Sequence, residues 1–235
     1  MTMKANELRA GQKEITKEIN RWAENNGLSR TDELKPITDG VADADAYLAS
    51  SPKVMWVLKE PYDELDNDQP SGGGWSITDD CFAKIDQKPV ARTWNNIVYV
   101  MYGIRHGKKW GEIPYIRDDR SIVNILKEIA YINVSKMPNK TWTSNSKLRH
   151  FYDIWKEILW KQIDLYNPDV IIFGSTLYLF LNDFAQKGHL RELREHDVWA
   201  WNDKLLLSAY HPQSRQKREE YVNNLINVIT TYYKS

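Results

Sequence analysis

Four short apolar runs, separated by amphipathic segments, constrain the fold more than any other feature of this sequence. Each run is rich in β-branched or other large apolar residues and ends at a polar or turn-forming segment. Runs of this kind are typical of strands buried on both faces of a sheet. The four predicted strands are Lys53–Leu58, Ile129–Val134, Asp169–Gly174 and Lys204–Ala209.

The segments around these runs carry the apolar spacing of helices. Leu148, Phe151, Trp155 and Ile158, for example, recur at helical spacing and form one apolar stripe. Strands that alternate with helices predict a mostly parallel sheet with helices on both faces. The predicted helices are Asn6–Asn25, Asp43–Leu48, Thr93–Tyr102, Asp119–Lys127, Lys147–Tyr166, Thr176–Phe184 and Arg218–Tyr232.

The expected architecture is therefore an α/β chain, a three-layer α/β/α sandwich around a central, mostly parallel four-stranded sheet. A chain of 235 residues is long enough for one well-buried core. We expect residues 1–235 to form a single domain, with residues 1–50 as an N-terminal helical extension packed on it.

Charge and composition limit the possible partners. Basic and acidic residues number 32 each, so nucleic-acid binding requires a local basic patch. The single cysteine, Cys81, cannot form an internal disulfide or supply a Cys-rich metal site, and we expect no metal and no cofactor. Met1–Glu24 lacks a signal-peptide core, and no run of 18 apolar residues occurs. We expect a cytoplasmic monomer without a membrane partner.

Polar residues follow each predicted strand where parallel strands share an edge. Glu60 follows the first strand, Asn133 ends the second, Ser175 follows the third and His211 follows the last. Taken singly, Glu60 is more often a solvated loop acid, Asn133 a turn former and His211 a structural corner. Open α/β sheets bind ligands at the carboxyl ends of their strands, so the shared edge favours a site.

Five segments carry motifs that occur in the same order in a known family. They are Leu58–Asp63, Trp75–Ile77, Ile132–Pro138, Pro168–Gly174 and His211–Arg215. Together they resemble the motifs of the uracil-DNA glycosylase superfamily, whose first motif reads Gly-Gln-Asp-Pro-Tyr-His and whose last begins His-Pro-Ser. The resemblance runs from Val54 to the C-terminus and leaves the first fifty residues outside it.

The resemblance implies two catalytic residues. Glu60 takes the place of the aspartate that activates water, and a carboxylate there can also stabilise the positive charge that develops on the sugar. His211 takes the place of a hydrogen-bond donor to the oxygen of the departing base.

The resemblance also implies a pocket for a base flipped out of the stack. Asn133 would read a pyrimidine edge, since a carboxamide is both donor and acceptor. Pro61 and Tyr62 match the first motif, in which the tyrosine blocks the 5-methyl group of thymine. Trp75, with Phe82 as the alternative, would supply the ring that stacks on the base.

Basic and polar residues near these motifs are candidates for contact with single- or double-stranded DNA. Arg215 is expected to fill the gap left by the flipped base. The basic loop of Arg105, Lys108 and Lys109 is either a second phosphate contact or a solvated turn. The remaining DNA-binding candidates are Lys136, Ser214, Lys217 and Arg218.

Three functions remain open. The first is a DNA glycosylase that hydrolyses the N-glycosidic bond of uracil or another modified base, in base-excision repair. The second is a non-catalytic member of the superfamily that binds nucleic acid or a nucleotide; Leu58 and Lys59, which replace the Gly-Gln of the motif, favour it. The third is an unrelated α/β enzyme such as a small-molecule hydrolase, although the chain lacks a Gly-x-Ser-x-Gly elbow.

Overall fold

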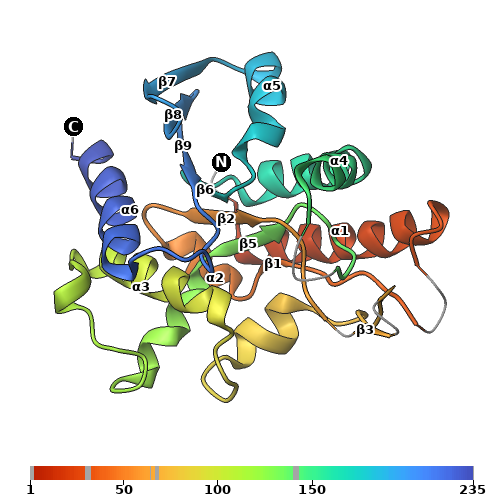
Figure 1. The fold of residues 1–235 in the computed structure, drawn as a ribbon, viewed down its shortest axis with the longest axis horizontal. Helices are drawn as coiled ribbons and strands as arrows, with labels where there is room; N and C mark the ends of the chain where they lie inside the picture. Colours follow the sequence, from red (N-terminus) through yellow and green to blue (C-terminus); the bar gives the residue numbers. More distant parts are fainter. Residues whose placement is uncertain (1–2, 30–32, 64, 67–68, 140–142, 235) are drawn as a thin grey trace.

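The computed structural model describes residues 3–29, 33–63, 65–66, 69–139 and 143–234. Helices and strands alternate along this chain (Figure 1). The helices are α1 Ala5–Asn25, α2 Ala44–Ala49, α3 Arg92–His106, α4 Asn145–Tyr166, α5 Leu177–Lys187 and α6 Arg218–Tyr232, with the shorter or tighter turns η1 Ile77–Cys81, η2 Phe82–Lys84, η3 Trp110–Glu112 and η4 Arg120–Glu128. The strands are β1 Gly40–Val41, β2 Val54–Leu58, β3 Leu65–Asp66, β4 Gln69–Pro70, β5 Ala130–Asn133, β6 Val170–Gly174, β7 Leu190–Arg194, β8 Val198–Trp201 and β9 Lys204–Ala209.

The main sheet contains the four predicted strands at its centre, but it is larger than predicted. Its order is β1-β5-β2-β6-β9-β8-β7, and β5, β2, β6 and β9 run parallel. The expectation of an α/β chain is confirmed. The expectation of four strands is wrong, because β1, β8 and β7 add antiparallel strands at the two edges. β1 is only two residues long, and β7 is mostly exposed, so neither produces a buried apolar run.

Side chains that alternate along each strand build two hydrophobic cores, one on each face of the sheet. Met55 and Val57 pack with α1, α2, α4 and α5, whereas Val54, Trp56 and Leu58 pack with α3, α6 and η4. Figure 1 shows α1 and α4 on one side of the sheet and α3 and α6 on the other. Side chains at the strand ends can therefore contact one another only where they point to the same face of the sheet.

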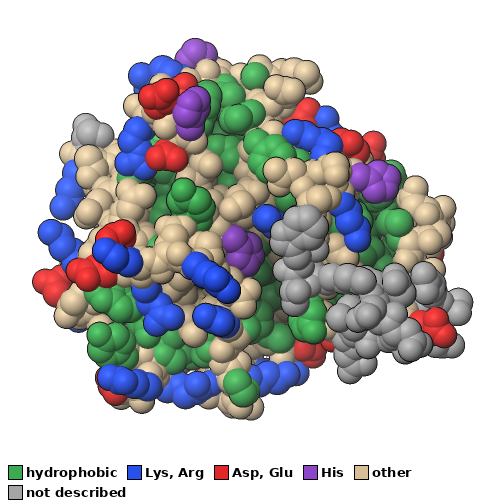
Figure 2. All heavy atoms as spheres, in the orientation of Figure 1, with side chains coloured by type: hydrophobic (Ala, Val, Ile, Leu, Met, Phe, Trp, Pro, Cys, Tyr) green, Lys and Arg blue, Asp and Glu red, His purple; other side chains and the backbone are tan. Residues whose placement is uncertain are grey.

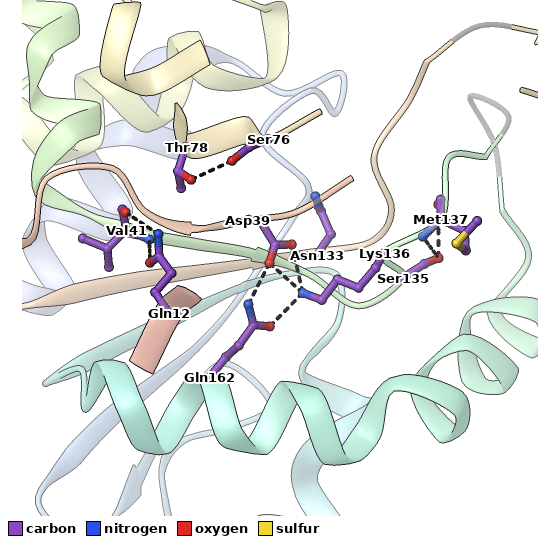
Figure 3. Close-up of polar contacts among 10 residues, drawn as sticks. All are labelled: Gln12, Asp39, Val41, Ser76, Thr78, Asn133, Ser135, Lys136, Met137 and Gln162. Carbon is purple, nitrogen blue, oxygen red and sulfur yellow. Dashed lines mark hydrogen bonds and ion pairs between the residues drawn. The ribbon is translucent and has the colours of Figure 1, made fainter. Parts of the chain in front are cut away.

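The N-terminal helix α1 packs in the core that contains Met55 and Val57, and it also closes an edge of the sheet. Leu8, Ile15 and Ile19 are buried there. The Gln12 carboxamide donates to the carbonyl of Val41 (2.9 Å) and accepts from its N–H (2.8 Å), as a neighbouring strand would (Figure 3). Such a contact blocks the edge against pairing with another chain. Among the described residues, no helix is long and apolar enough to cross a membrane.

Candidate functional site

The carboxyl ends of the four parallel strands bring the predicted polar residues to one edge of the sheet. Leu58 of β2 is in register with Asn133 of β5, and Gly174 of β6 with Ala209 of β9. Glu60 and His211 lie two residues beyond the ends of β2 and β9. The site is therefore built from segments that are distant in sequence but adjacent in the sheet.

Asn133 has a buried carboxamide without a partner. The residue is 1% exposed, and among the described residues neither its side-chain oxygen nor its nitrogen has a hydrogen bond. Its backbone N–H donates to Oδ2 of Asp39 at 2.8 Å. Leaving a buried polar group unsatisfied costs about 1–3 kcal/mol. An orphaned donor and acceptor on one buried carboxamide are available to a ligand, which makes Asn133 a candidate binding position.

A buried ionic cluster fixes the backbone beneath Asn133. The Nζ of Lys136 donates to both carboxylate oxygens of Asp39 (2.8 and 2.9 Å) and to Oε1 of Gln162 (2.8 Å), and Nε2 of Gln162 donates to Asp39 (2.8 Å). In Figure 3 the Asn133 side chain points away from Lys136 and Gln162. The cluster therefore fixes the Asn133 backbone and leaves the Asn133 carboxamide free.

The position of Lys136 corrects one expectation. Its side chain is 0% exposed, so it has no surface from which to bind a DNA phosphate. Burial lowers the pKa of Lys136, and the Asp39 carboxylate opposes that effect. Lys136 is a structural residue of the site, not a DNA contact.

Glu60 has one engaged carboxylate oxygen and one that is free. Oε1 accepts a hydrogen bond from the Thr143 hydroxyl, whereas Oε2 is buried without a partner among the described residues. Thr143 accepts from Nδ2 of Asn139 (2.9 Å). Burial raises the pKa of Glu60, against the lowering effects of Thr143, Lys59 and Lys147. A carboxyl group whose pKa is raised in this way is suited to proton transfer.

Replacing Thr143 by valine should raise the pKa of Glu60 further, because the Thr143 hydrogen bond lowers it. The carboxylate would then be protonated at a higher pH than in the native chain. Carbon-13 NMR titration of the Glu60 carboxyl group measures this directly. Thr143→Ser retains the hydroxyl and should leave the titration near its native position; an unchanged pKa in Thr143→Val would contradict the assigned role.

His211 is held as a neutral donor. Burial, and then the charge of Lys59, lower its pKa to about 4. Its Nδ1 accepts from the backbone N–H of Gln213 at 3.2 Å, so in the neutral ring the proton lies on Nε2. The turn is fixed by Ser175 Oγ, which accepts from the His211 N–H (3.1 Å), and by Asn96, whose Nδ2 donates to the Pro212 carbonyl (2.7 Å).

The three predicted site residues share an edge but are not bonded to one another. Among the described residues, no hydrogen bond or ion pair joins Glu60, Asn133 and His211 directly. Glu60 is hydrogen-bonded to Thr143, which lies just before α4. Asn133 is instead the register partner of Leu58, which packs on the face of the sheet covered by α3. Lys59 acts electrostatically on both Glu60 and His211.

Leu58 fills space at the centre of this edge. It is 1% exposed, and a Cβ added to Gly174 would come within 2.4 Å of Leu58 Cδ2 and 3.3 Å of Pro212 Cδ. A larger residue at position 174 would therefore require the end of the Leu58 side chain to move. Leu58 therefore lies between its register partner Asn133 on β5 and the turn that contains His211 and Pro212.

The other base-binding candidates differ in their exposure. Trp75 is half-buried, and its Nε1 donates to Oδ2 of Asp63 (2.8 Å), which also accepts from the Gly73 N–H (2.6 Å). Tyr62 is 57% exposed, so its ring lies on the surface rather than inside a closed pocket. Pro61 is buried, and its carbonyl accepts from the N–H of Asn139 (3.1 Å). Phe82 is buried against Trp94 and Tyr131.

The loop after His211 carries the exposed basic groups. Arg215 is exposed, Lys217 pairs with Glu220 (3.1 Å), and Ser214 accepts from Gln216 (3.1 Å). On the face drawn in Figure 2, Lys and Arg side chains lie around a histidine near the middle of the view. The guanidinium group of Arg218, one residue further, lies over the rings of Tyr99 and Trp110 (5.7 and 5.9 Å).

The second basic loop lies at the other end of the strands. Arg105 donates to the carbonyl of Ser51 (2.9 Å), just before β2, and pairs with Glu128 (3.0 Å). Lys108 and Lys109 line a pocket with Pro52 at the same end. Of the two alternatives for this loop, its place at the amino ends of the strands, away from the candidate site, favours a turn over a second phosphate contact.

Several site residues could not be found from sequence patterns. Asp39 and Asn139 lie in polar segments without a motif, and Thr143 lies outside every motif. Gln162 offers one signal, since it interrupts a buried face of α4 beside Leu159 and Ile163. A polar residue on an apolar stripe indicates a buried partner.

Comparisons with known proteins add no family. No family model matches the chain, and no curated protein matches it. Among the described residues, no cluster of three or more His, Cys, Asp or Glu side chains could hold a metal ion.

Proposed function

We propose that this protein is a DNA glycosylase that hydrolyses the N-glycosidic bond of uracil or another modified base flipped out of DNA, as in base-excision repair. The observation that carries the proposal is the buried, unpartnered carboxamide of Asn133. It lies at the same sheet edge as a carboxyl group with a raised pKa and a neutral imidazole. Helices on both faces of the sheet also fit the three-layer fold of the superfamily whose motifs the chain resembles.

The two catalytic groups suit the charges of this reaction. As the glycosidic bond breaks, the sugar becomes positive and the base becomes negative. Oε2 of ionised Glu60 would orient water or stabilise the sugar cation. His211 Nε2–H would donate to the base oxygen, and a donor held in place beforehand is worth about 10²–10³ in rate.

Asn133 would recognise the base, because its carboxamide can both donate and accept hydrogen bonds along a pyrimidine edge. Trp75 would stack on the flipped base, and Arg215 would occupy the gap in the duplex. Extrusion costs least for a mismatched or damaged base, which contributes to selectivity.

A panel of substrates tests the proposal. Single- and double-stranded oligonucleotides that carry uracil, hypoxanthine or hydroxymethyluracil are incubated with the protein, and abasic sites are then cleaved with alkali. We expect strand scission at one of these bases. If no base gives scission at high protein concentration, the glycosylase proposal fails.

The position of Leu58 favours a second candidate, a non-catalytic protein that binds nucleic acid or a nucleotide. A leucine that fills the space between Asn133 and His211 leaves less room for a reacting base and sugar. Such a protein would bind deoxyuridine monophosphate or DNA without turnover, so binding without scission in the same panel favours it.

Replacing Leu58 by alanine should increase the affinity for deoxyuridine monophosphate, because it opens space beside Asn133. The same change should lower the free energy of unfolding by about 2–5 kcal/mol, the usual cost of Leu→Ala in a core. Calorimetric titration and urea unfolding measure the two effects. Leu159→Ala, in the core on the other face, should reproduce the loss of stability alone; equal affinities in the two variants would rule out this role for Leu58.

A further inference from the structure

Three exposed tyrosines stand around the candidate site. Tyr62 follows β2, Tyr178 lies in the first turn of α5 after β6, and Tyr210 follows β9 directly. Their exposed fractions are 57%, 40% and 67%. These three rings lie at the same ends of three adjacent strands, and we call them the aromatic rim. Because the rings are exposed, they do not contribute to the packing of the core.

The backbone beneath two of these rings is held in place. The Tyr210 carbonyl accepts from the Tyr221 hydroxyl at 3.0 Å. Arg149 donates to the Tyr178 carbonyl (3.1 Å), and its guanidinium group lies 5.6 Å from the Tyr178 ring centre. Burial raises the pKa of Tyr178; the Arg149 charge opposes this effect, and the charge of Glu60, which lies near enough to act on the ring, adds to it. A backbone held in this way limits the movement of the side chains it carries, which lowers the entropic cost of stacking on a ligand.

Basic side chains accompany the rim. Lys147 is exposed and donates to Oδ1 of Asn139 (3.1 Å), beside the Glu60 network. Arg215 and Lys217 are exposed on the loop after His211. Tyr210 also lines a groove of about 290 Å³ between β9 and α6, together with Gln216. Aromatic rings combined with a few cations are typical of surfaces that bind single strands.

We propose that this rim binds single-stranded nucleic acid, with Tyr178 and Tyr210 stacking on the bases that flank the one in the site. The inference rests on the proposed function, because it names the form of nucleic acid that the same edge receives. In a duplex the faces of these flanking bases are covered by their neighbours, so exposed rings favour a strand whose bases are open. With about three phosphate contacts, the slope of log K against log salt should be about −2.

Binding of an unmodified, fluorescently labelled 12-nucleotide strand tests the inference. Anisotropy should show tighter binding to this strand than to its duplex. Tyr178→Ala and Tyr210→Ala should each weaken single-strand binding about 5- to 150-fold, the range for loss of one stacked base. Tyr178→Phe and Tyr210→Phe keep the ring and should bind as the native chain does. Tyr233→Ala is the matched control, since Tyr233 is 46% exposed but lies beyond the end of α6, near Asp169 at the other end of the strands.

Equal or tighter binding to the duplex would overturn the inference, as would alanine variants that bind like Tyr233→Ala. Because the strand has no modified base, this result is independent of catalysis. Single-strand binding that depends on the two tyrosines, without scission of any substrate, would support the rim and reject the glycosylase. Strand scission by the native chain, together with unchanged single-strand binding in the tyrosine variants, would support the glycosylase and reject the rim.

Discussion

Replacing Lys136 by methionine should lower the free energy of unfolding by about 3–5 kcal/mol, as expected when one partner of a buried ion pair is removed. Lys136 and Asp39 side chains are both 0% exposed, and the lysine donates to both carboxylate oxygens. Methionine fills similar space but leaves the Asp39 carboxylate without its counter-charge. Urea unfolding of the full chain measures the loss.

Two further variants make this prediction specific. Asp39→Asn in the Lys136→Met background removes the unpaired charge and keeps an oxygen that can accept from Asn133, so part of the stability should return. Lys161→Met is the matched control, because Lys161 pairs with Glu18 at the surface (52% and 35% exposed). Exposed pairs contribute about 0–1 kcal/mol. Similar losses for Lys136→Met and Lys161→Met would show that the buried cluster is not important for stability.

On the substrate identified by the panel, Glu60→Gln should lower kcat by about 100-fold or more, the range for loss of a positioned acid or base. Glutamine has nearly the same shape but carries no charge that could orient water or stabilise the sugar cation. Activity of the native protein should fall as pH decreases through the raised pKa of Glu60, because the carboxylate is the active form. The residual activity of Glu60→Gln should show no such decrease at any pH above the pKa of His211, which is about 4.

His211→Ala should also lower kcat strongly, with duplex and single-strand affinity retained. The controls replace the same residue types at exposed positions: Glu14→Gln on α1 and His196→Ala in the turn between β7 and β8. Both should react like the native chain. A Glu60→Gln variant with native kcat would exclude Glu60 as the catalytic carboxylate.

The centre of the fold could be predicted because its signals are local. Each parallel strand is an apolar run, and α6 begins and ends at the predicted residues Arg218 and Tyr232. The edges could not be predicted, since β1 has two residues and β7 is mostly exposed. The segment predicted as a helix at Asp119–Lys127 is the 3₁₀ helix η4, a distinction that apolar spacing over so few turns does not make.

The shared sheet edge of the candidate residues could be predicted, but the contacts that they make could not. Residues directly after apolar runs, such as Glu60 and His211, reach the edge by topology alone. The partners of Lys136 are 97 and 26 residues away, so its burial depends on tertiary contacts that no motif records. The motif around Lys136 therefore predicts an exposed lysine, whereas the residue belongs to the interior.

The contact between Asp39 and the Asn133 backbone has a practical consequence for expressing shorter versions of this protein. Every segment that resembles a glycosylase motif lies after residue 53, so a fragment cut at that boundary would retain all of these segments. It would lack Asp39, leaving the Lys136 ammonium group and the Asn133 N–H without their acceptor, and would also lack the Gln12 contacts that close the sheet edge. Such a fragment should be insoluble or self-associate, and its inactivity would say nothing about the chemistry of the motifs it retains.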